Sequence, residues 1–170
     1  MFTLEKISPT DTAEFRSTVL AYWQELMPYS DVMSDPVRQE QYFQQQYTWE
    51  GGSGHPYWAL LGDRRIGIVN FSIFPAEKRA EIEDFYVFPE ERRLGYGSEI
   101  MRAVFRYFDG VGIERVDLTV RRDNPNALAF WEAQGFMLAN YHLRQYRDPS
   151  TGTAFRGALS SDFPPPEPAS

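Results

Sequence analysis

One segment of the sequence is more informative than any other: Val87-Phe88-Pro89-Glu90-Glu91-Arg92-Arg93-Leu94-Gly95-Tyr96-Gly97-Ser98. It lies between a strand-like run, residues 79–88, and a run with helical periodicity, residues 95–108. A strand that leads through a glycine-containing turn into a helix presents backbone N–H groups and the positive end of the helix dipole, which together bind phosphate. Gly95 and Gly97 lack the Cβ atoms that would keep a pyrophosphate from the backbone, and Arg92 and Arg93 add two cations. The segment therefore predicts a site for a phosphate-bearing ligand.

Two other phosphate-binding patterns do not fit this segment. A dinucleotide-binding fingerprint needs a third glycine three residues after Gly97, where the chain has Ile100. A Walker loop needs Gly-Lys-Ser or Gly-Lys-Thr, which the segment lacks. A plain turn before a helix is the alternative that the segment alone leaves open.

The rest of the sequence mixes strand and helix patterns around this segment. Alternating or apolar runs predict strands over residues 2–8, 57–61, 65–74, 79–88, 116–120, 136–147 and 153–159. Helical spacing predicts helices over residues 11–27, 39–49, 95–108 and 125–134, the second of them opened by Pro36. Because residues 62–64 are short enough for a hairpin, three antiparallel neighbours are expected between residues 57 and 88.

Length and composition indicate one domain without thiol chemistry. The chain has 170 residues, 42% of them hydrophobic, which is enough for a single domain, expected over residues 1–160. Residues 161–170 are Pro-rich, and we expect an extended, disordered tail there. The absence of cysteine excludes a disulfide framework, a thiolate zinc site, an iron–sulfur cluster and a cysteine nucleophile. Two histidines argue against a histidine-rich metal site, so we expect no metal.

The charge balance is acidic. Seventeen Lys and Arg against 24 Asp and Glu give a net charge of −7, which argues against nucleic-acid binding and suits a cationic partner. The first residues do not resemble a signal peptide, and no window approaches about 18 apolar residues. We therefore expect a cytoplasmic protein that does not associate with membranes.

Two motifs resemble those of the GNAT superfamily of CoA-dependent N-acyltransferases. The acyl-CoA-binding motif of that family is Arg or Gln, two residues, Gly, one residue, then Gly or Ala, and Arg92, Gly95 and Gly97 fill those places. Farther along, the chain resembles the second motif of the family at the expected separation, with Leu118-Thr119-Val120, Asn124, Ala127, Phe130-Trp131 and Gly135-Phe136. The resemblance implies an α/β (α+β) fold: a mixed, mostly antiparallel central sheet of six to seven strands, flanked by about four helices. Its two central strands would splay apart around the pantetheine arm of acetyl-CoA (coenzyme A).

The resemblance also implies which residues bind the cofactor. Backbone groups of Phe85 and Val87 would bond the pantetheine, and a backbone N–H near Val87 would meet the oxyanion. The pyrophosphate would be held by amides from the segment Arg92, Arg93, Gly95, Tyr96, Gly97 and Ser98. Asn124 would meet the cofactor near the second strand, and Arg121 and Arg122 are candidates for its outer phosphate.

Acyl transfer to an amine needs the neutral amine. A lysine-like ammonium has a pKa of roughly 10.4, so removing its proton near pH 7 costs about 3.4 units, or roughly 4.6 kcal/mol, and a general base is useful. Strand alternation places Glu81 and Glu83 on one face with Phe85 and Val87, and Asp84 on the other. Glu81 and Glu83 are therefore the predicted bases, and by resemblance Glu81 falls where several family members place a glutamate. A solvated polar edge is the alternative.

The general acid and the acceptor are less defined. Trp131 stands where the family usually has the tyrosine that protonates the departing thiolate, which leaves Tyr86, Tyr96, Tyr141 or water as substitutes. By resemblance, the first helices shape the acceptor pocket, and here they supply aromatic and acidic side chains: Tyr22, Trp23, Glu25, Tyr29, Asp31, Asp35, Tyr42, Tyr47 and Trp49. Such a wall favours a cation.

The sequence thus predicts an N-acetyltransferase that moves acetyl from acetyl-CoA to a primary amine of a cationic acceptor, either a small molecule or a protein. Transfer would be direct, in a ternary complex, because no cysteine is present to carry the acyl group. The alternative is a non-catalytic acyl-CoA-binding or regulatory module, which the missing tyrosine favours. Relatives often pair through their last strands, so a homodimer is a further expectation.

Overall fold

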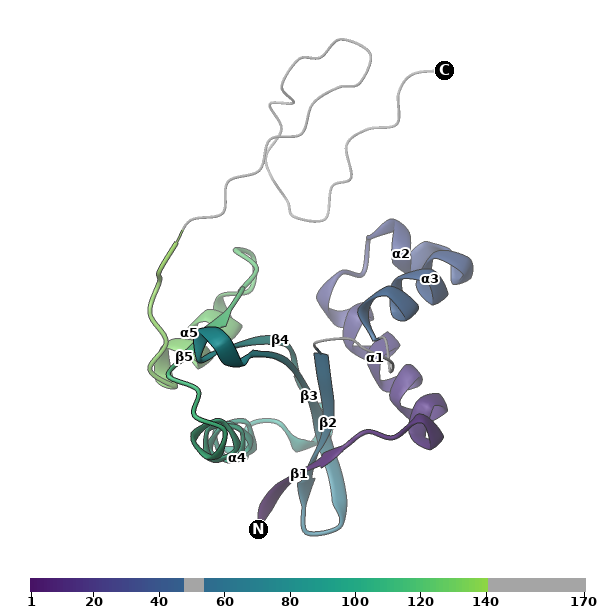
Figure 1. Ribbon diagram of the computed structural model, residues 1–170. Coiled ribbons are helices and arrows are strands. Elements are labelled where there is room, and N and C mark those ends of the chain that lie inside the picture. Colours follow the sequence, from purple (N-terminus) through teal and green to yellow (C-terminus); the bar gives the residue numbers. More distant parts are fainter. Residues whose placement is uncertain (48–53, 141–170) are drawn as a thin grey trace, which may run out of the picture.

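The computed structural model describes residues 1–47 and 54–140, which fold around one five-stranded sheet (Figure 1). The strands are β1 (Phe2–Lys6), β2 (Gly54–Leu61), β3 (Arg64–Phe74), β4 (Arg79–Val87) and β5 (Arg115–Leu118). They lie in the order β1-β2-β3-β4-β5, with antiparallel neighbours from β1 to β4 and one parallel pair, β4–β5. The mixed, mostly antiparallel sheet is confirmed, although the described residues form five strands rather than six or seven.

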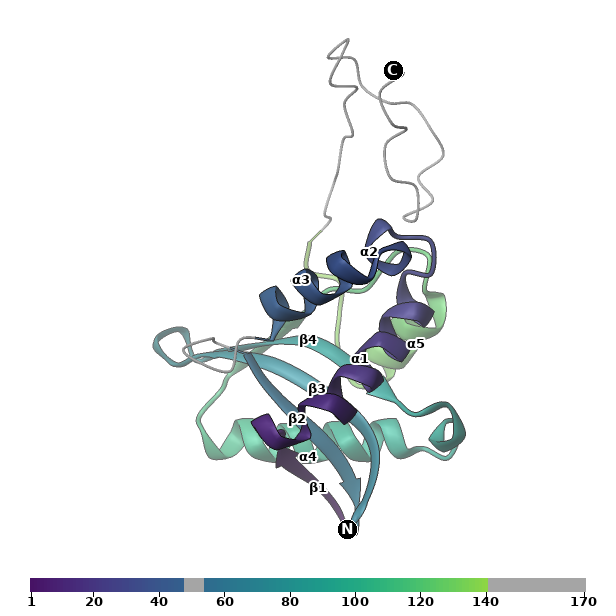
Figure 2. The same ribbon diagram turned by 90° about the vertical axis from the view of Figure 1, so that its right-hand side faces the viewer.

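Helices cover both faces of the sheet. They are α1 (Thr12–Leu26), α2 (Asp31–Ser34), α3 (Pro36–Gln46), α4 (Tyr96–Gly110) and α5 (Pro125–Ala133), with 3₁₀ turns at Pro9–Asp11, Pro75–Glu77 and Pro89–Glu91. In Figure 1, α1, α2 and α3 lie to one side of the sheet, and α4 and α5 lie to the other. Figure 2 shows α1 and α4 crossing opposite faces of the same strands.

Each face of the sheet has its own apolar core. The α4 side buries residues of β3 and β4 against Ile100, Met101, Val104 and Phe108, all of them on the inner stripe of α4. The α1 side is largely aromatic, because Phe15 and Trp23 of α1 meet Phe43 of α3 and Trp58 of β2. The helical periodicity recognised in the sequence is therefore the periodicity of these two buried stripes.

Two elements differ from the expectation. A short helix, α2, interrupts the polar segment before Pro36; its N-cap is Ser30, whose Oγ accepts a hydrogen bond from the Met33 N–H. Residues 136–140 form no strand, contrary to the prediction for 136–147, because no described strand lies beside them to complete a ladder. The remainder of that strand, the strand expected over 153–159, the Pro-rich tail, Trp49 and Tyr141 lie outside the described residues.

Candidate active site

The sheet opens between β4 and β5. The two strands pair only as far as Ile82 and Leu118, yet β4 continues to Val87. The Phe88 N–H donates to a carbonyl of β3 at 3.0 Å. Because backbone groups alternate along a strand, those of Phe85 and Val87 point to the opposite edge, which β5 no longer covers. This is the splay that the family resemblance implied.

The turn before α4 exposes peptide donors. In the described part of the chain, the N–H groups of residues 93–97 have no hydrogen-bond partner, whereas those of Ser98 and Glu99 donate to the Gly95 carbonyl at 3.2 and 3.4 Å. Gly95 has a φ of 79°, in the left-handed region that favours glycine, and no side chain caps the helix. We call residues 93–97 the phosphate cradle, since free N–H groups at a helix N-terminus attract anions.

Gly97 allows α4 to approach two stacked rings. The rings of Phe85 and Phe130 are stacked, with their centroids 5.4 Å apart. A Cβ added to Gly97 would lie 3.1 Å from Cε2 of Phe130, a contact tight enough to move the ring. The second glycine of the motif therefore serves packing between α4, β4 and α5 as well as access to the backbone.

The first arginine of the motif is directed toward the protein itself. The Arg92 Nε–H donates to the Val87 carbonyl oxygen at 2.8 Å. Its Nη2 donates to both carboxylate oxygens of Glu25, at 2.8 and 3.1 Å, and its guanidinium lies 5.1 Å from the centre of the Tyr86 ring. Arg92 therefore connects α1 to the end of β4 rather than presenting a free cation.

Arg93 and Arg122 do present free cations. Both are exposed, and they are the only arginines among residues 1–47 and 54–140 with neither a hydrogen bond nor an ion pair. Arg93 belongs to the cradle, and Arg122 follows β5. Arg121 instead donates to Asp123. The sequence indicates all of these arginines as candidate cofactor ligands, but it does not tell which of them are free and which are paired.

The other predicted cofactor residues have structural partners. Oδ1 of Asn124 accepts the Ala127 N–H at 3.0 Å and so caps α5. Oγ of Ser98 accepts from Nε2 of Gln134 at 3.0 Å, which connects α4 to the end of α5. Tyr96 packs on Phe2.

Neither Trp131 nor Tyr86 offers a free acid. Trp131 is a core residue, 8% exposed, with ring contacts to Phe85 and Phe136. The Tyr86 hydroxyl donates to Glu25 at 2.7 Å. Burial, together with the hydrogen bond and charge of Glu25, raises the pKa of Tyr86 to about 12.

One extra residue in β4 changes which side chains share a face. Asn70 pairs with Asp84 and Phe71 pairs with Ile82, so Glu83 has no counterpart on β3 and forms a β-bulge. Ile82 before the bulge packs into the α4-side core, and so does Phe85, three residues later.

The alternation that grouped Glu81 and Glu83 with Phe85 and Val87, apart from Asp84, is therefore wrong. Phe85 and Val87 pack on the α4 side, while Glu83 and Asp84 both accept hydrogen bonds from a side chain on the other face. A strand alternates regularly only while its pairing is regular, and the bulge breaks that regularity.

Five polar side chains gather at the bulge on the α1 side. Nδ2 of Asn70 donates to Glu83 Oε2 at 2.9 Å and to Asp84 Oδ2 at 3.2 Å. Oγ of Ser72 donates to Glu83 Oε1, and the Tyr47 hydroxyl donates to Asp84 Oδ2 at 2.7 Å. Asn70 and Ser72 are each only 2% exposed. We call these five residues the bulge cluster.

The electrostatics of the bulge cluster centre on Asp84. Burial raises the pKa of its carboxyl above the usual range, and the charge of Glu83 raises it further, although the hydrogen bonds it accepts oppose the change. Burial also raises the pKa values of Tyr22, Tyr42 and Tyr47, and the charge of Asp84 adds to each. Asp84 thus faces the aromatic wall that the sequence predicted for the acceptor.

Glu81 stands outside this cluster. It pairs with Asp117 across the β4–β5 ladder, and its Oε2 accepts from Nη1 of Arg79 at 3.1 Å. Arg79 also contacts Glu77 and Asp117. Of the two predicted bases, the structure brings Glu83 into the cluster and holds Glu81 in a surface network of ion pairs.

The sequence reasoning did not identify Asn70 and Ser72. Their signal was present, because they are the only polar residues between Gly67 and Phe74, two positions apart and therefore on one face of an apolar strand. Two polar side chains buried side by side in a strand indicate a polar partner above that face.

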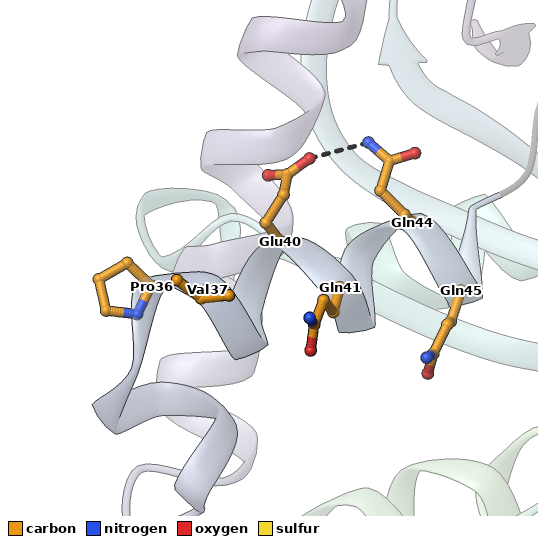
Figure 3. Close-up of a pocket in the computed structure, with 6 residues that line it drawn as sticks. All are labelled: Pro36, Val37, Glu40, Gln41, Gln44 and Gln45. Carbon is orange, nitrogen blue, oxygen red and sulfur yellow. Dashed lines mark hydrogen bonds between the residues drawn. The ribbon is translucent and has the colours of Figure 1, made fainter.

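A hollow lies along α3 (Figure 3). It is lined by Pro36, Val37, Glu40, Gln41, Gln44 and Gln45. Its carboxylate is already engaged, since Glu40 accepts from Gln44 at 2.8 Å and from Arg16 at 2.9 Å. None of its residues belongs to the cradle or to the bulge cluster.

The described residues contain neither a metal-binding cluster nor a membrane-spanning helix. Within the described ranges, no group of three or more His, Asp or Glu side chains is arranged to hold a metal ion. No helix of this part of the chain has both the length and the apolar character to cross a bilayer.

Comparison with known proteins gives the family. The model of the Acetyltransferase (GNAT) family matches residues 19–136, which include the cradle and most of the sheet. A search of curated proteins gave no significant match.

Solved structures share the fold at low sequence identity. YycN from Bacillus subtilis is 16% identical, with 86% of this chain and 98% of that chain covered and a TM-score of 0.71. The PaiA N-acetyltransferase from Thermoplasma acidophilum, in complex with coenzyme A, is 16% identical (84% and 93% covered, TM-score 0.64). The aminoglycoside acetyltransferase meta-AAC0020 from an uncultured soil metagenomic sample, in complex with sisomicin, is 16% identical (86% and 95% covered, TM-score 0.62). Because the family match spans well over half of the sequence, this chain belongs to the GNAT family of acetyltransferases.

Proposed function

We propose that the protein is an N-acetyltransferase that transfers the acetyl group of acetyl-CoA directly to a primary amine of a cationic acceptor. The strongest support is that the bulge cluster and the phosphate cradle are connected by one short segment of β4, residues 83–87, and the turn that follows it. The segment leads from the bulge cluster, through a free backbone edge, to the turn that contains the cradle. An acyl donor and an amine bound at these two places would meet at the open edge of β4.

The residues at the cradle fit coenzyme A. Its diphosphate needs donors and positive charge, and the cradle has peptide N–H groups without partners as well as the free guanidinium of Arg93. The Val87 carbonyl oxygen already accepts a hydrogen bond from Arg92, so the Val87 N–H is the backbone group of this residue that remains for the ligand. When bound, acetyl-CoA supplies the activated acyl group as a thioester. Phe85 and Val87 would orient the pantetheine arm, with Arg122 toward an outer phosphate.

Glu83 is the base that we propose for the amine. Its carboxylate is fixed by donors from Asn70 and Ser72 and forms no ion pair with a described lysine or arginine. Taking one proton from the acceptor's ammonium leaves a neutral nitrogen with a free lone pair. Glu81 is the weaker candidate because Arg79 occupies its carboxylate.

The acidic and aromatic surroundings of Asp84 favour a cationic acceptor. Tyr22, Tyr42 and Tyr47 contribute rings whose faces attract ammonium groups, and the chain carries a net charge of −7. Two structural neighbours support the same chemistry, since one is an N-acetyltransferase bound to coenzyme A and another is an aminoglycoside acetyltransferase.

Two measurements test the proposal. Isothermal titration calorimetry measures the affinity for coenzyme A and acetyl-CoA, and a thiol-release assay with a panel of amines measures transfer. We expect saturable binding of both nucleotides and thiol release that depends on an amine. Tight binding without thiol release for any amine would overturn the enzymatic proposal and favour an acyl-CoA-binding module.

A further inference from the structure

One buried acceptor atom in the bulge cluster has no donor. Oδ1 of Asn70 lacks a hydrogen-bond partner, although the residue is only 2% exposed. The amide cannot turn over to correct this, because its Nδ2 already donates to the carboxylates of Glu83 and Asp84. A buried carbonyl oxygen without a donor is destabilising, and such atoms are rare in folded proteins. A donor from a bound ligand would remove this cost.

The same cluster lacks a positive charge. Neither Glu83 nor Asp84 forms an ion pair with a described lysine or arginine. Glu83 is exposed, as are Asp63 and Glu132, which also lack an ion pair; of these four acids only Asp84 is not exposed. The surroundings of Asp84 are desolvated, so its carboxylate gains more from a counter-ion than an exposed carboxylate does.

Aromatic side chains restrict the approach to these atoms. Tyr47 is 4% exposed and donates to Asp84, and its ring packs on Phe15 and Trp23. Tyr42 contacts Trp23 with ring centroids 4.8 Å apart. These rings crowd the α1 side of Asp84, which favours a slender ligand, and ring faces attract a cation.

We infer that the bulge cluster binds the terminal ammonium of an unbranched aminoalkyl arm, with Asn70 Oδ1, Asp84 and Glu83 accepting its three N–H groups. The inference rests on the proposed function and names its substrate class. The ammonium transfers one proton to the Glu83 carboxylate, which becomes a carboxylic acid, and the electron pair of the broken N–H bond stays on nitrogen as the lone pair that attacks the acyl group. A free linear diamine and a lysine side chain share this chemistry. An amine on a ring carries two substituents on the carbon next to nitrogen, so it is wider at that point than an unbranched arm and should fit less well.

The first experiment compares three amines on the wild-type protein with coenzyme A bound. Calorimetry measures the affinity of cadaverine, of a lysine-containing peptide with an acetylated N-terminus, and of cyclohexylamine. We expect at least one of the two linear amines to bind about ten-fold or more tightly than cyclohexylamine, because the cluster offers several charge-assisted hydrogen bonds to a slender ammonium. Whether cadaverine or the peptide binds more tightly identifies a small-molecule or a protein acceptor.

The second experiment removes one charge. Asp84→Asn keeps the shape of the side chain, and we expect it to weaken binding of the preferred linear amine about ten-fold or more while leaving the affinity for coenzyme A unchanged. Asp63→Asn in the β2–β3 turn is the matched control and should leave both affinities unchanged. Thermal unfolding checks that each variant is folded; if Asp84→Asn is not, the comparison of amines on the wild-type protein decides.

The outcomes separate the two proposals. Equal affinity for cyclohexylamine and the linear amines, or full affinity in folded Asp84→Asn, would overturn the inference even if the enzyme acetylates amines. Absence of thiol release with every amine would overturn the proposed function, while the binding data would still report on the ammonium site.

Discussion

Glu25 on α1 is bonded to Arg92, at the start of the turn before α4, through contacts of 2.8 and 3.1 Å. The Tyr86 hydroxyl donates to the same carboxylate at 2.7 Å, and Arg92 donates in turn to the Val87 carbonyl. The helix that borders the proposed acceptor site is thereby connected to the turn that contains the cradle. Because Glu25 neutralises Arg92, the net positive charge at the cradle comes from Arg93.

This pairing predicts that Arg92 and Arg93 contribute differently to cofactor binding. The double variant Glu25→Gln/Arg92→Gln preserves the net charge and should bind coenzyme A within about three-fold of the wild type, because an exposed ion pair contributes at most about 1 kcal/mol. Arg93→Gln removes an uncompensated cation and should weaken binding about five-fold or more, which corresponds to about 1 kcal/mol.

Calorimetry at low and at physiological salt measures both effects, and salt should reduce the Arg93 effect because it screens exposed charges. Lys6→Gln, a charge change on β1, is the control. A double variant that loses as much affinity as Arg93→Gln would contradict the assignment of the free cation to Arg93.

The two glycines at opposite ends of α4 should respond differently to alanine. Gly95 has a φ of 79°, so Gly95→Ala forces a side chain into the left-handed region at a cost of about 1–2 kcal/mol. Gly110 has no positive φ, and a Cβ there meets nothing within 4 Å. Gly110→Ala should therefore be neutral or stabilise by up to about 1 kcal/mol.

Urea unfolding with both variants side by side measures the difference. Gly95→Ala should also weaken binding of coenzyme A, since the cradle depends on this backbone conformation, while Gly110→Ala should not. Similar stability losses in the two variants would show that the turn does not require glycine.

Much of the fold follows from local sequence patterns. The apolar run of β3 and the helical stripe of α4 are long enough to identify both elements, and the observed bounds, Arg64–Phe74 and Tyr96–Gly110, differ from the predicted ones by two residues or fewer. Helix α2 could not be predicted in this way, because four residues are too few to show a period and its start depends on one capping side chain, Ser30.

The arrangement of the site was harder to predict because it depends on pairing between distant residues. Ile82 and Phe85 are three positions apart in one strand, and both enter the α4-side core only because Glu83 forms a bulge against β3. In the sequence, only this odd spacing of apolar residues indicated the bulge. The pairing of Glu25 with Arg92, 67 residues later, has no local signal at all.

Asp84 is expected to lower stability at neutral pH. A carboxyl whose folded pKa is raised binds its proton more strongly in the folded state, so the folded protein is favoured at low pH, and this contribution is lost as the pH rises through the folded pKa. Asp84→Asn removes the charge but can still accept from Tyr47. It should unfold at a higher temperature than the wild type at pH 7. The expected gain in the free energy of unfolding is about 1.4 kcal/mol for each unit by which the pKa of Asp84 is raised.

Thermal unfolding from pH 7 down to acidic pH measures this effect, and the advantage of Asp84→Asn should shrink as the wild-type carboxyl becomes protonated. Asp63→Asn, an exposed change of the same kind, should show no such trend. If Asp84→Asn is less stable than the wild type at neutral pH, the hydrogen bonds to the carboxylate outweigh its desolvation.

The two glutamates of β4 should differ in catalysis. Glu83→Gln removes the proposed base and should lower kcat/KM by about 10²- to 10⁴-fold, the usual effect of a positioned base. Glu81→Gln disturbs an ion pair with Arg79 and should change the rate less than about ten-fold.

The two variants should also differ in their pH dependence. Without a base, the reaction depends on amine that has already lost its proton. Below the amine pKa of roughly 10.4, this neutral fraction increases about ten-fold for each unit by which the pH is raised. Glu83→Gln should therefore regain activity at alkaline pH, with a steeper pH–rate profile than the wild type, whereas Glu81→Gln should keep the wild-type profile. The reverse pattern would identify Glu81 as the base, and two unchanged profiles would exclude both carboxylates.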